Sequence, residues 1–314
     1  MGWYNKNMRA FITGIDGFTG RHLVEFLKKK GIRVTGVDLE TTRYNRLNLT
    51  DREKLFEVLK KTKPDYIFHL ASPILRSDRL IDDNLAKNLE VDLFGTVNLL
   101  QAASNLTKKP RVLIAGTAAV YKPEEKKPFK ENAGLEPATA YGLSKLTQEL
   151  VCLSLAKSYR LPLIITRSIL LIGPHQSPGF VVNDFCRFVA ECEAGKEKPV
   201  LKTGNLSIKR DFTDVRDGVK AYLSLIKKGK AGEVYNVCSG RVYSIGEVVD
   251  WLKKNSLKPF RVLASKKKLR ANDPKVITAD NTKLRQATGW RPEVSFEESL
   301  KDTLNYWRNE IKAR

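Results

Sequence analysis

Three glycines at three-residue intervals follow a short apolar run near the start of the chain, in the stretch FITGIDGFTG. The run reads as a strand, and an amphipathic helix follows the glycines, which is the context of a phosphate-binding crossover. Gly14 permits a tight turn, Gly17 lets the backbone approach a pyrophosphate, and Gly20 lets helix and strand pack closely. The helix N-terminus offers unpaired N–H groups and a positive dipole end to the phosphates. The alternative is a flexible turn.

Strand and helix signals alternate along the N-terminal half of the chain. Apolar, β-rich runs predict strands over residues 9–14, 33–39, 65–72, 111–121 and 162–173. Helical periodicity predicts helices over residues 19–30, 52–61, 88–104 and 140–159. Buried strands separated by helices predict a parallel sheet covered on both faces, which is a doubly wound α/β fold of the Rossmann type.

Beyond Gly173 the pattern loosens into loop-forming sequence and shorter elements, up to a closing helix over residues 295–311. We therefore predict a dinucleotide-binding Rossmann domain over residues 8–173. A smaller, mixed α/β lobe is predicted over residues 174–314, mainly for the substrate. Segments within about 208–240 are expected to return to the first domain.

The charge balance is strongly basic, with 56 lysines and arginines against 35 aspartates and glutamates and a formal net charge of +21. Nucleic-acid binding is one interpretation of such a charge. The basic residues are spread along the chain, however, and their runs fall at expected helix ends and loops, where lysine complements the helix dipole. This distribution favours a solvated surface, with a bias toward an anionic small substrate, over nucleic acid.

No stretch approaches the ~18 consecutive apolar residues of a membrane span, so no membrane partner is expected. The N-terminus has no apolar signal region, and we expect a cytoplasmic protein. The cysteines, which show no C-x-x-C spacing, are Cys152, Cys186, Cys192 and Cys238. With only three histidines beside them, the sequence predicts buried free thiols and no metal site.

The second predicted strand ends in GVDLE and places Asp38 where an acid accepts hydrogen bonds from the ribose hydroxyls of an adenosine. An acid at this place repels a 2′-phosphate, so NAD(H) is favoured. NADP(H) stays possible because Arg43 is near. The alternative role for Asp38 is to cap a turn at the strand end.

Tyr141 and Lys145 stand one helical turn apart in AYGLSK, so both side chains project from one helix face. A tyrosine with a pKa near 10 exchanges protons at neutral pH only with help, and a neighbouring ammonium supplies that help by favouring phenolate. Thr117 ends a predicted strand at the sheet edge where open α/β folds bind ligands. Together the three predict a hydride-transfer site in which Tyr141 exchanges the proton. A chance helix pair is the alternative.

In this order and spacing, the glycine loop, DYIFHLAS, GTAAVY and YGLSK resemble the extended short-chain dehydrogenase/reductases that act on nucleotide sugars. The resemblance covers essentially the whole chain from Met8. It implies an NAD-dependent nucleotide-sugar oxidoreductase or epimerase, and a homodimer formed through a four-helix bundle of segments 91–103 and 141–159. The residues expected to contact the cofactor are Gly14, Gly17, Phe18, Thr19, Gly20, Asp38, Leu39, Asn48, Leu49, Leu70, Ala71, Ser72, Tyr141, Lys145 and Ser168.

The C-terminal half resembles the GDP-4-dehydro-6-deoxy-D-mannose reductases, which make GDP-D-rhamnose. The resemblance implies a GDP-linked substrate, and two arginines suit its diphosphate because guanidinium binds phosphate bidentately. A surface ion pair is the alternative for each arginine. The residues expected along the nucleotide-sugar cleft are Thr117, Gln176, Phe180, Val181, Asn183, Arg210 and Arg270.

The chain departs from the family pattern at several places. Dehydratases of the superfamily carry an acidic acid/base group where this chain has Ala118 and Ala119, and a methyl group cannot move a proton. Asp92 and Leu170 stand where asparagine is usual, and Ala271 stands where proline is usual. The two alanines argue against 4,6-dehydration. The leading function, which the resemblance of the C-terminal half implies, is reduction of a 4-keto sugar, and a nucleotide-sugar 4-epimerase is the alternative. A non-catalytic relative that binds dinucleotide or RNA is a third, remote interpretation.

Overall fold

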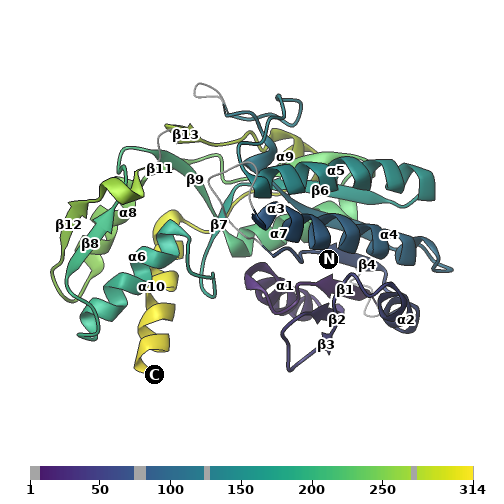
Figure 1. Ribbon diagram of the computed structural model, residues 1–314, viewed down its shortest axis with the longest axis horizontal. Coiled ribbons are helices and arrows are strands. Elements are labelled where there is room, and N and C mark those ends of the chain that lie inside the picture. Colours follow the sequence, from purple (N-terminus) through teal and green to yellow (C-terminus); the bar gives the residue numbers. More distant parts are fainter. Residues whose placement is uncertain (1–7, 74–82, 124–127, 270–273, 314) are drawn as a thin grey trace.

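The computed structural model describes residues 8–73, 83–123, 128–269 and 274–313. A seven-stranded sheet with its helices forms one lobe, on the right in Figure 1, and a smaller lobe lies beside it. The chain ends at the foot of the smaller lobe, in the closing helix α10 (Phe296–Lys312).

The large sheet is parallel throughout, with the strand order β10-β6-β5-β4-β1-β2-β3. Its strands are β1 (Arg9–Thr13), β2 (Arg33–Asp38), β3 (Asn45–Arg46), β4 (Tyr66–His69), β5 (Arg111–Thr117), β6 (Leu163–Ser168) and β10 (Val234–Val237). The predicted Rossmann-type fold is confirmed. Because β1 pairs with β2 on one side and with β4 on the other, the strand order reverses at β1, and ligands of such sheets bind at that point.

Helices cover both faces of the sheet because successive strand side chains point to opposite sides. Ile12 packs with α1 and α7 on one face, and Phe11 packs with α2, α4 and α5 on the other. Full burial of each such side chain contributes about 1.5–3 kcal/mol. These helices are α1 (Phe18–Lys29), α2 (Arg52–Thr62), α4 (Thr96–Ser104), α5 (Ala140–Tyr159) and α7 (Val215–Lys228), with α9 (Thr282–Thr288) behind α7.

The helix predicted over residues 88–104 starts earlier and is not uniform. It consists of α3 (Asp83–Leu89), a π-helical turn η1 (Glu90–Gly95) and then α4. Within the π-helical turn, the Thr96 hydroxyl donates to the Asp92 carbonyl oxygen at 2.5 Å. Such wide turns are frequently found at functional sites, and this one faces α5.

Three predicted strands are shorter than expected. β4, predicted over residues 65–72, covers only Tyr66–His69. β5 ends at Thr117, whose hydroxyl accepts a hydrogen bond from the Ala119 amide at 3.2 Å and so caps a 3₁₀ turn, η2 (Ala118–Val120). The run over residues 162–173 divides into β6 and β7 (Leu170–Ile172) because β7 leaves the large sheet and pairs with β9 (Lys209–Asp214). The chain therefore crosses into the smaller lobe just beyond Ser168.

The smaller lobe has a separate apolar core, in which α6, α8 and α10 pack around Phe212 and Leu201. β9 pairs with β7, β11 and β13, and β8 pairs with β12. The remaining elements are α6 (Val181–Glu193), β8 (Val200–Thr203), β11 (Val242–Ser244), α8 (Ile245–Asn255), β12 (Arg261–Ala264), η3 (Lys266–Lys268) and β13 (Val276–Ile277). The domain boundaries predicted from the sequence stay a prediction.

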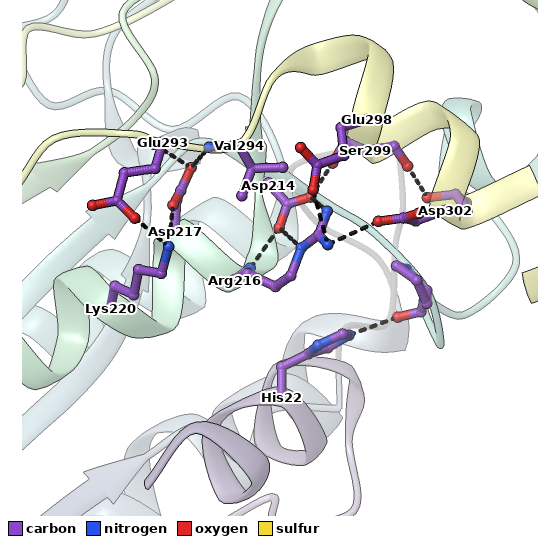
Figure 2. A network of polar contacts seen from close by, with 12 residues as sticks. His22, Asp214, Arg216, Asp217, Lys220, Glu293, Val294, Glu298, Ser299 and Asp302 are labelled. Atoms are coloured by element: carbon purple, nitrogen blue, oxygen red, sulfur yellow. Dashed lines mark hydrogen bonds and ion pairs between the residues drawn. The ribbon is translucent and has the colours of Figure 1, made fainter. Parts of the chain in front are cut away.

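Polar side chains at the start of α7 contact the closing helix α10 (Figure 2). Asp214 caps α7 and binds the Arg216 guanidinium, with Asp214 Oδ1 2.8 Å from Arg216 Nε. Asp214 also accepts from the Ser299 hydroxyl, and Arg216 reaches Asp302 at 2.8 Å, both on α10. His22 of α1 donates to a carbonyl oxygen of the loop after β7 at 2.9 Å, so α1 is fixed to the entry of the smaller lobe.

The four cysteines are buried free thiols, as predicted. Among the described residues, no group of three or more His, Cys, Asp or Glu side chains could hold a metal ion. None of the helices in the described parts of the chain has the length and apolar character to cross a membrane.

Candidate active site

The glycine loop after β1 sits against the end of β4. Gly14 has a φ of +71°, and its amide donates to the Val37 carbonyl at 3.0 Å. A Cβ at Gly14 would lie 2.8 Å from the Ala71 amide nitrogen, so the two loops approach too closely for a side chain here. The tight turn predicted for Gly14 is therefore required by both backbone conformation and space.

The N-terminus of α1 suits an anion. Its N-cap, Gly17, has no side-chain cap, and the first turn, which includes Phe18 and Thr19, carries no acidic residue. A Cβ at Gly20 would lie 2.1 Å from the Gly14 carbonyl oxygen, so glycine is needed for helix and loop to meet. The first-turn N–H groups and the helix dipole together favour a phosphate at this end.

Asp38, at the end of β2, holds the glycine loop from the other side. Its Oδ2 accepts from the Asp16 amide at 3.0 Å. Beyond it lies an open hollow of about 450 Å³, lined by Leu39, Glu40, Arg46, Leu47, Asn48, Asp51 and Lys54. Two predicted cofactor residues, Leu39 and Asn48, thus share this hollow, and Leu49 is buried next to it at 4 % exposed.

The segment after β4 lies beside the glycine loop. The Ala71 amide donates to the Thr13 hydroxyl at 3.3 Å, which links the predicted segment Leu70–Ser72 to β1. The hydroxyl oxygen of Ser72 is buried without a hydrogen-bond partner among the described residues. A buried polar atom without a partner costs free energy, and a bound ligand that reaches Ser72 would remove that cost.

The start of α5 is held directly against the end of β5. A Cβ at Gly142 would lie 2.4 Å from the Ala119 carbonyl oxygen, so only glycine lets the first turn of α5 pack on η2. Tyr141 is its direct neighbour in that turn and is half-buried. Thr117 and Ser168 are register partners at the ends of β5 and β6. The sequence analysis did not single out Gly142.

The hydroxyl group of Ser168, at the end of β6, pairs with that of a buried tyrosine on α7. Ser168 Oγ lies 2.8 Å from the Tyr222 hydroxyl, and Tyr222 is fully buried on α7. Burial raises the pKa of Tyr222, and charges on Tyr141 and Lys145 also act on it. Tyr222 is a site residue that the sequence analysis missed, because helical apolar spacing alone assigns such a tyrosine to the core.

Lys145 is 4 % exposed and its ammonium group is surrounded by acceptors. Lys145 Nζ lies 3.1 Å from Asp92 Oδ1 and donates to Gln148 Oε1 at 3.1 Å and to the Ala115 carbonyl at 3.4 Å. Burial works against the charge on Lys145, but Asp92 and Tyr141 outweigh it, so the pKa of the ammonium group is raised. Lys145 therefore stays a cation beside Tyr141.

A chain of buried hydrogen bonds runs from Thr13 in the glycine-loop strand to Lys145. His69 Nδ1 lies 2.7 Å from the Thr13 hydroxyl, and His69 Nε2 lies 2.8 Å from the Thr96 hydroxyl. Because the Thr96 hydrogen goes to the Asp92 carbonyl, Nε2 must donate and Nδ1 must accept. Gln148 then donates to Thr96 at 2.8 Å and accepts from Lys145.

Burial and, to a smaller extent, the charge on Lys145 together lower the pKa of His69 to about 3. His69 is therefore a neutral link in this chain. Sequence reasoning missed His69, Thr96 and Gln148, since no local motif joins residues from β4, α4 and α5.

The predicted substrate residues divide into two groups. Gln176 is 3 % exposed; its amide nitrogen donates to the Leu171 carbonyl at 2.7 Å, and its Oε1 is buried without a partner among the described residues. Asn183 is fully buried, and both ends of its amide are engaged, by Trp307 Nε1 at 2.7 Å and by the Ser177 carbonyl at 3.1 Å. The structure thus brings Asn183 into the core of the smaller lobe.

Phe180 and Val181 lie at the start of α6, at its N-cap and first residue. Arg210 is 6 % exposed, and its guanidinium donates to the carbonyls of Lys209 and Pro274, both at 2.8 Å. Arg270, like Ala271, lies outside the described residues. The substrate roles of these residues stay predictions.

Comparison with known proteins places this geometry among nucleotide-sugar enzymes. The family model described as GDP-mannose 4,6 dehydratase matches residues 11–303. A GDP-6-deoxy-D-mannose reductase of Pseudomonas aeruginosa is 29 % identical over 306 residues, which cover 97 % of this chain and 98 % of the relative.

Two solved structures have the same fold over nearly their whole length. The protein RMD of Pseudomonas aeruginosa, complexed with NADPH, has a TM-score of 0.86 and 30 % identity, with 96 % of this chain and 99 % of that chain covered. The UDP-glucose 4-epimerase of Thermus thermophilus, complexed with NAD, has a TM-score of 0.82 and 26 % identity, with 96 % and 99 % covered.

Proposed function

The chain belongs to the GDP-mannose 4,6 dehydratase family, and on that premise we propose that it is a nucleotide-sugar reductase with Tyr141 as its proton donor. The observation that carries the proposal is the buried Lys145 ammonium beside Tyr141, at the sheet edge where Thr117 and Ser168 end their strands. The proposed reaction reduces a 4-keto sugar to an alcohol.

A nicotinamide dinucleotide fits the loops at the switch point. Glycine stands at the loop positions where a Cβ would collide with neighbouring backbone, and the first turn of α1 has no acidic residue. The hydroxyl oxygen of Ser72 is buried without a hydrogen-bond partner among the described residues. When bound there, the dinucleotide supplies the hydride. Asp38 favours NAD(H) because its carboxylate opposes a 2′-phosphate. Arg46 and Lys54 in the adjoining hollow leave NADP(H) possible, and the similar Pseudomonas protein was solved with NADPH.

In the proposed mechanism, the keto oxygen lies between the hydroxyls of Thr117 and Tyr141. Thr117 donates a hydrogen bond to that oxygen as negative charge develops on it. Tyr141 transfers its proton to the oxygen, and the Lys145 ammonium stabilises the phenolate that remains. General acid catalysis of this kind contributes about 10²–10⁴-fold to the rate.

The proposed substrate is GDP-4-dehydro-6-deoxy-D-mannose, and the product is GDP-D-rhamnose. The similarity to the GDP-6-deoxy-D-mannose reductase of Pseudomonas aeruginosa over nearly the full length supports this choice. Gln176, with an unpartnered buried oxygen among the described residues, is proposed to meet the nucleotide sugar together with Phe180, Val181 and Arg210. Ala119 carries no acid/base group, so dehydration is not proposed.

A nucleotide-sugar 4-epimerase is the second candidate. It is favoured by the stretch TAAVY, residues 117–121, which resembles that of sugar 4-epimerases, and by the similarity to the Thermus thermophilus UDP-glucose 4-epimerase. The same Tyr141 and Lys145 would serve both reactions. Only a reductase consumes reduced cofactor with each turnover.

We also propose a homodimer through the helices over residues 91–103 and 141–159. Phe94 on η1 and Leu150 on α5 are 59 % and 58 % exposed. Large apolar side chains exposed on helices that pack together are suited to a shared interface.

The test is NADH oxidation with a panel of GDP-, UDP- and dTDP-linked 4-keto-6-deoxy sugars. The proposal predicts one NADH consumed per sugar reduced, with the GDP-linked sugar preferred. Interconversion of 4-hydroxy nucleotide sugars at C4, without net consumption of NADH, would favour the epimerase instead. Absence of turnover with every keto sugar of the panel would contradict the reductase.

A further inference from the structure

A buried carboxylate lies directly against the proposed catalytic lysine. Asp92 is fully buried in the π-helical turn η1, and its Oδ1 is 3.1 Å from Lys145 Nζ, with Lys145 itself 4 % exposed. In the low dielectric of a protein interior, two opposite charges at this distance interact strongly.

The Asp92 carboxylate has two polar contacts among the described residues: Oδ2 accepts from Ser144, and Oδ1 forms the ion pair with Lys145 without a well-aligned hydrogen bond. Ser144 Oγ donates to Asp92 Oδ2 at 2.9 Å, and Thr96 donates to the Asp92 backbone carbonyl. Gln148 bonds to both Thr96 and Lys145. The wide turn of η1 therefore fixes a negative charge beneath the ammonium group, on the helix pair that also carries Tyr141.

The other titratable groups around Lys145 carry no charge near neutral pH. Burial lowers the pKa of His69 on β4 to about 3 and raises the pKa of Cys152 on α5 to about 12. Burial also raises the pKa of Tyr222 on α7. All three groups are therefore neutral there, and the charges that decide the protonation of Tyr141 and Lys145 are their own and that of Asp92.

One more buried charge pair lies on the same helix but is self-contained. Glu149 receives two hydrogen bonds from the Arg167 guanidinium, at 3.0 and 2.5 Å. Because Arg167 offsets Glu149, the pair contributes little net field at Lys145. Asp92 has no comparable second cation among its described contacts.

We propose that Asp92 is a positioning residue that keeps the Tyr141–Lys145 pair fully protonated, and so able to donate a proton, up to a higher pH than the pair would reach without it. The proposal rests on the proposed function for its effect on turnover. The negative charge stabilises the ammonium and offsets part of its field at Tyr141, so it disfavours loss of a proton from either group. The two groups titrate as a coupled pair, and the direction of the effect does not depend on which one loses the proton first.

The test is Asp92→Asn, which removes the charge and keeps the shape. Two readouts are used: the pH dependence of keto-sugar reduction, and an ultraviolet-difference titration of tyrosine phenolate in the protein without cofactor. The alkaline limb of the rate profile should move to lower pH by about 1 unit or more. The first phenol to titrate should move the same way, and this signal should be absent in the double variant with Tyr141→Phe.

Asp217→Asn is the matched control. Asp217 is a carboxylate at 1 % exposure, 3.3 Å from Lys220, and it lies on α7 near α10 (Figure 2). Asp217→Asn should leave the alkaline limb of the rate profile in place. Asp92→Glu keeps the negative charge that Asp92→Asn removes, so its alkaline limb should lie closer to that of the natural protein than the limb of Asp92→Asn does. Should Asp92→Asn fail to fold, Asp92→Ser provides the same loss of charge and must give the same shift.

Superimposable rate profiles and titrations for Asp92→Asn and the natural protein would overturn the proposal. An equal shift in Asp217→Asn would overturn it as well. A shifted phenol titration in a protein that reduces no keto sugar would support the role of Asp92 and contradict the proposed function. Normal turnover with an unmoved limb would contradict the role of Asp92 alone.

Discussion

Alanine at Gly17 separates the proposed cofactor role of the glycine loop from its structural role. Gly17 has φ and ψ of −66° and 170°, a conformation open to any residue. A Cβ built there meets one described atom within 4 Å, the Gly14 carbonyl oxygen at 3.2 Å, so a shift of a few tenths of an ångström accommodates it. At a compatible position the loss of glycine restricts the unfolded chain and stabilises the fold by about 0.4–1 kcal/mol. The free energy of unfolding should therefore change by less than about 1 kcal/mol.

The same methyl group should weaken dinucleotide binding, because it stands where the backbone of α1 is proposed to approach the pyrophosphate. Displacing a closely packed group by one methyl costs about 1–3 kcal/mol. That cost corresponds to a rise of roughly 5- to 150-fold in the Kd for NADH. The Kd is measured by fluorescence titration with NADH, and the fold is checked by thermal melting of the same samples.

Gly20→Ala is the companion variant. Its Cβ would lie 2.1 Å from the Gly14 oxygen and 2.6 Å from the Ile15 oxygen, so the backbone itself must move. This variant should lower the Tm as well as NADH affinity. An unchanged Kd in Gly17→Ala, with the fold intact, would refute the placement of the pyrophosphate at this loop.

Three further outcomes are expected. Asp38→Ala should raise the preference for NADPH over NADH by roughly tenfold, about 1.4 kcal/mol, as measured by the two Kd values; an unchanged ratio would remove Asp38 from cofactor selection. His69 binds no proton in the folded protein until about pH 3 but does so from pH 6.5 when unfolded. As the pH falls from 6.5 to about 3, His69 therefore makes the free energy of unfolding fall by about 1.4 kcal/mol per pH unit. His69→Gln should lack that part of the slope in denaturant titrations at a series of pH values, and parallel slopes would contradict the neutral assignment. Phe94→Glu should convert the proposed dimer to a monomer on size-exclusion chromatography, whereas Leu257→Glu, at a residue 78 % exposed, should not; a dimer in both would place the interface elsewhere.

The large sheet and the glycine loop could be predicted from the sequence because their signals are local. Apolar runs and spaced glycines act within one strand–turn–helix unit, and Tyr141 and Lys145 share one helix face at a spacing of one turn. The parallel sheet with helices on both faces then follows from the alternation of strands and helices along the chain.

The surroundings of Lys145 could not be predicted in the same way. Asp92 contacts Lys145 from the π-helical turn η1, which joins α3 to α4, and no local sequence pattern predicts that turn. Thr96, His69 and Gln148 come from three elements and meet in a single buried chain of hydrogen bonds.

In the smaller lobe, prediction from the sequence is limited by contacts between residues that lie far apart in the chain. The resemblance placed Asn183 along the substrate cleft, and that role stays a prediction. The contact between its amide and Trp307, more than a hundred residues later in the sequence, could not be predicted from a local pattern. Likewise, β7 looks continuous with β6 in sequence, but its pairing partner β9 belongs to another sheet.

The most direct test of the account is turnover by Tyr141→Phe with GDP-4-dehydro-6-deoxy-D-mannose and NADH. Loss of the phenolic hydroxyl removes the proposed proton donor and leaves the glycine loop unchanged. The account predicts a kcat lower by about 10²–10⁴-fold, with a Kd for NADH close to that of the natural protein. A kcat equal to that of the natural protein would contradict the central claim.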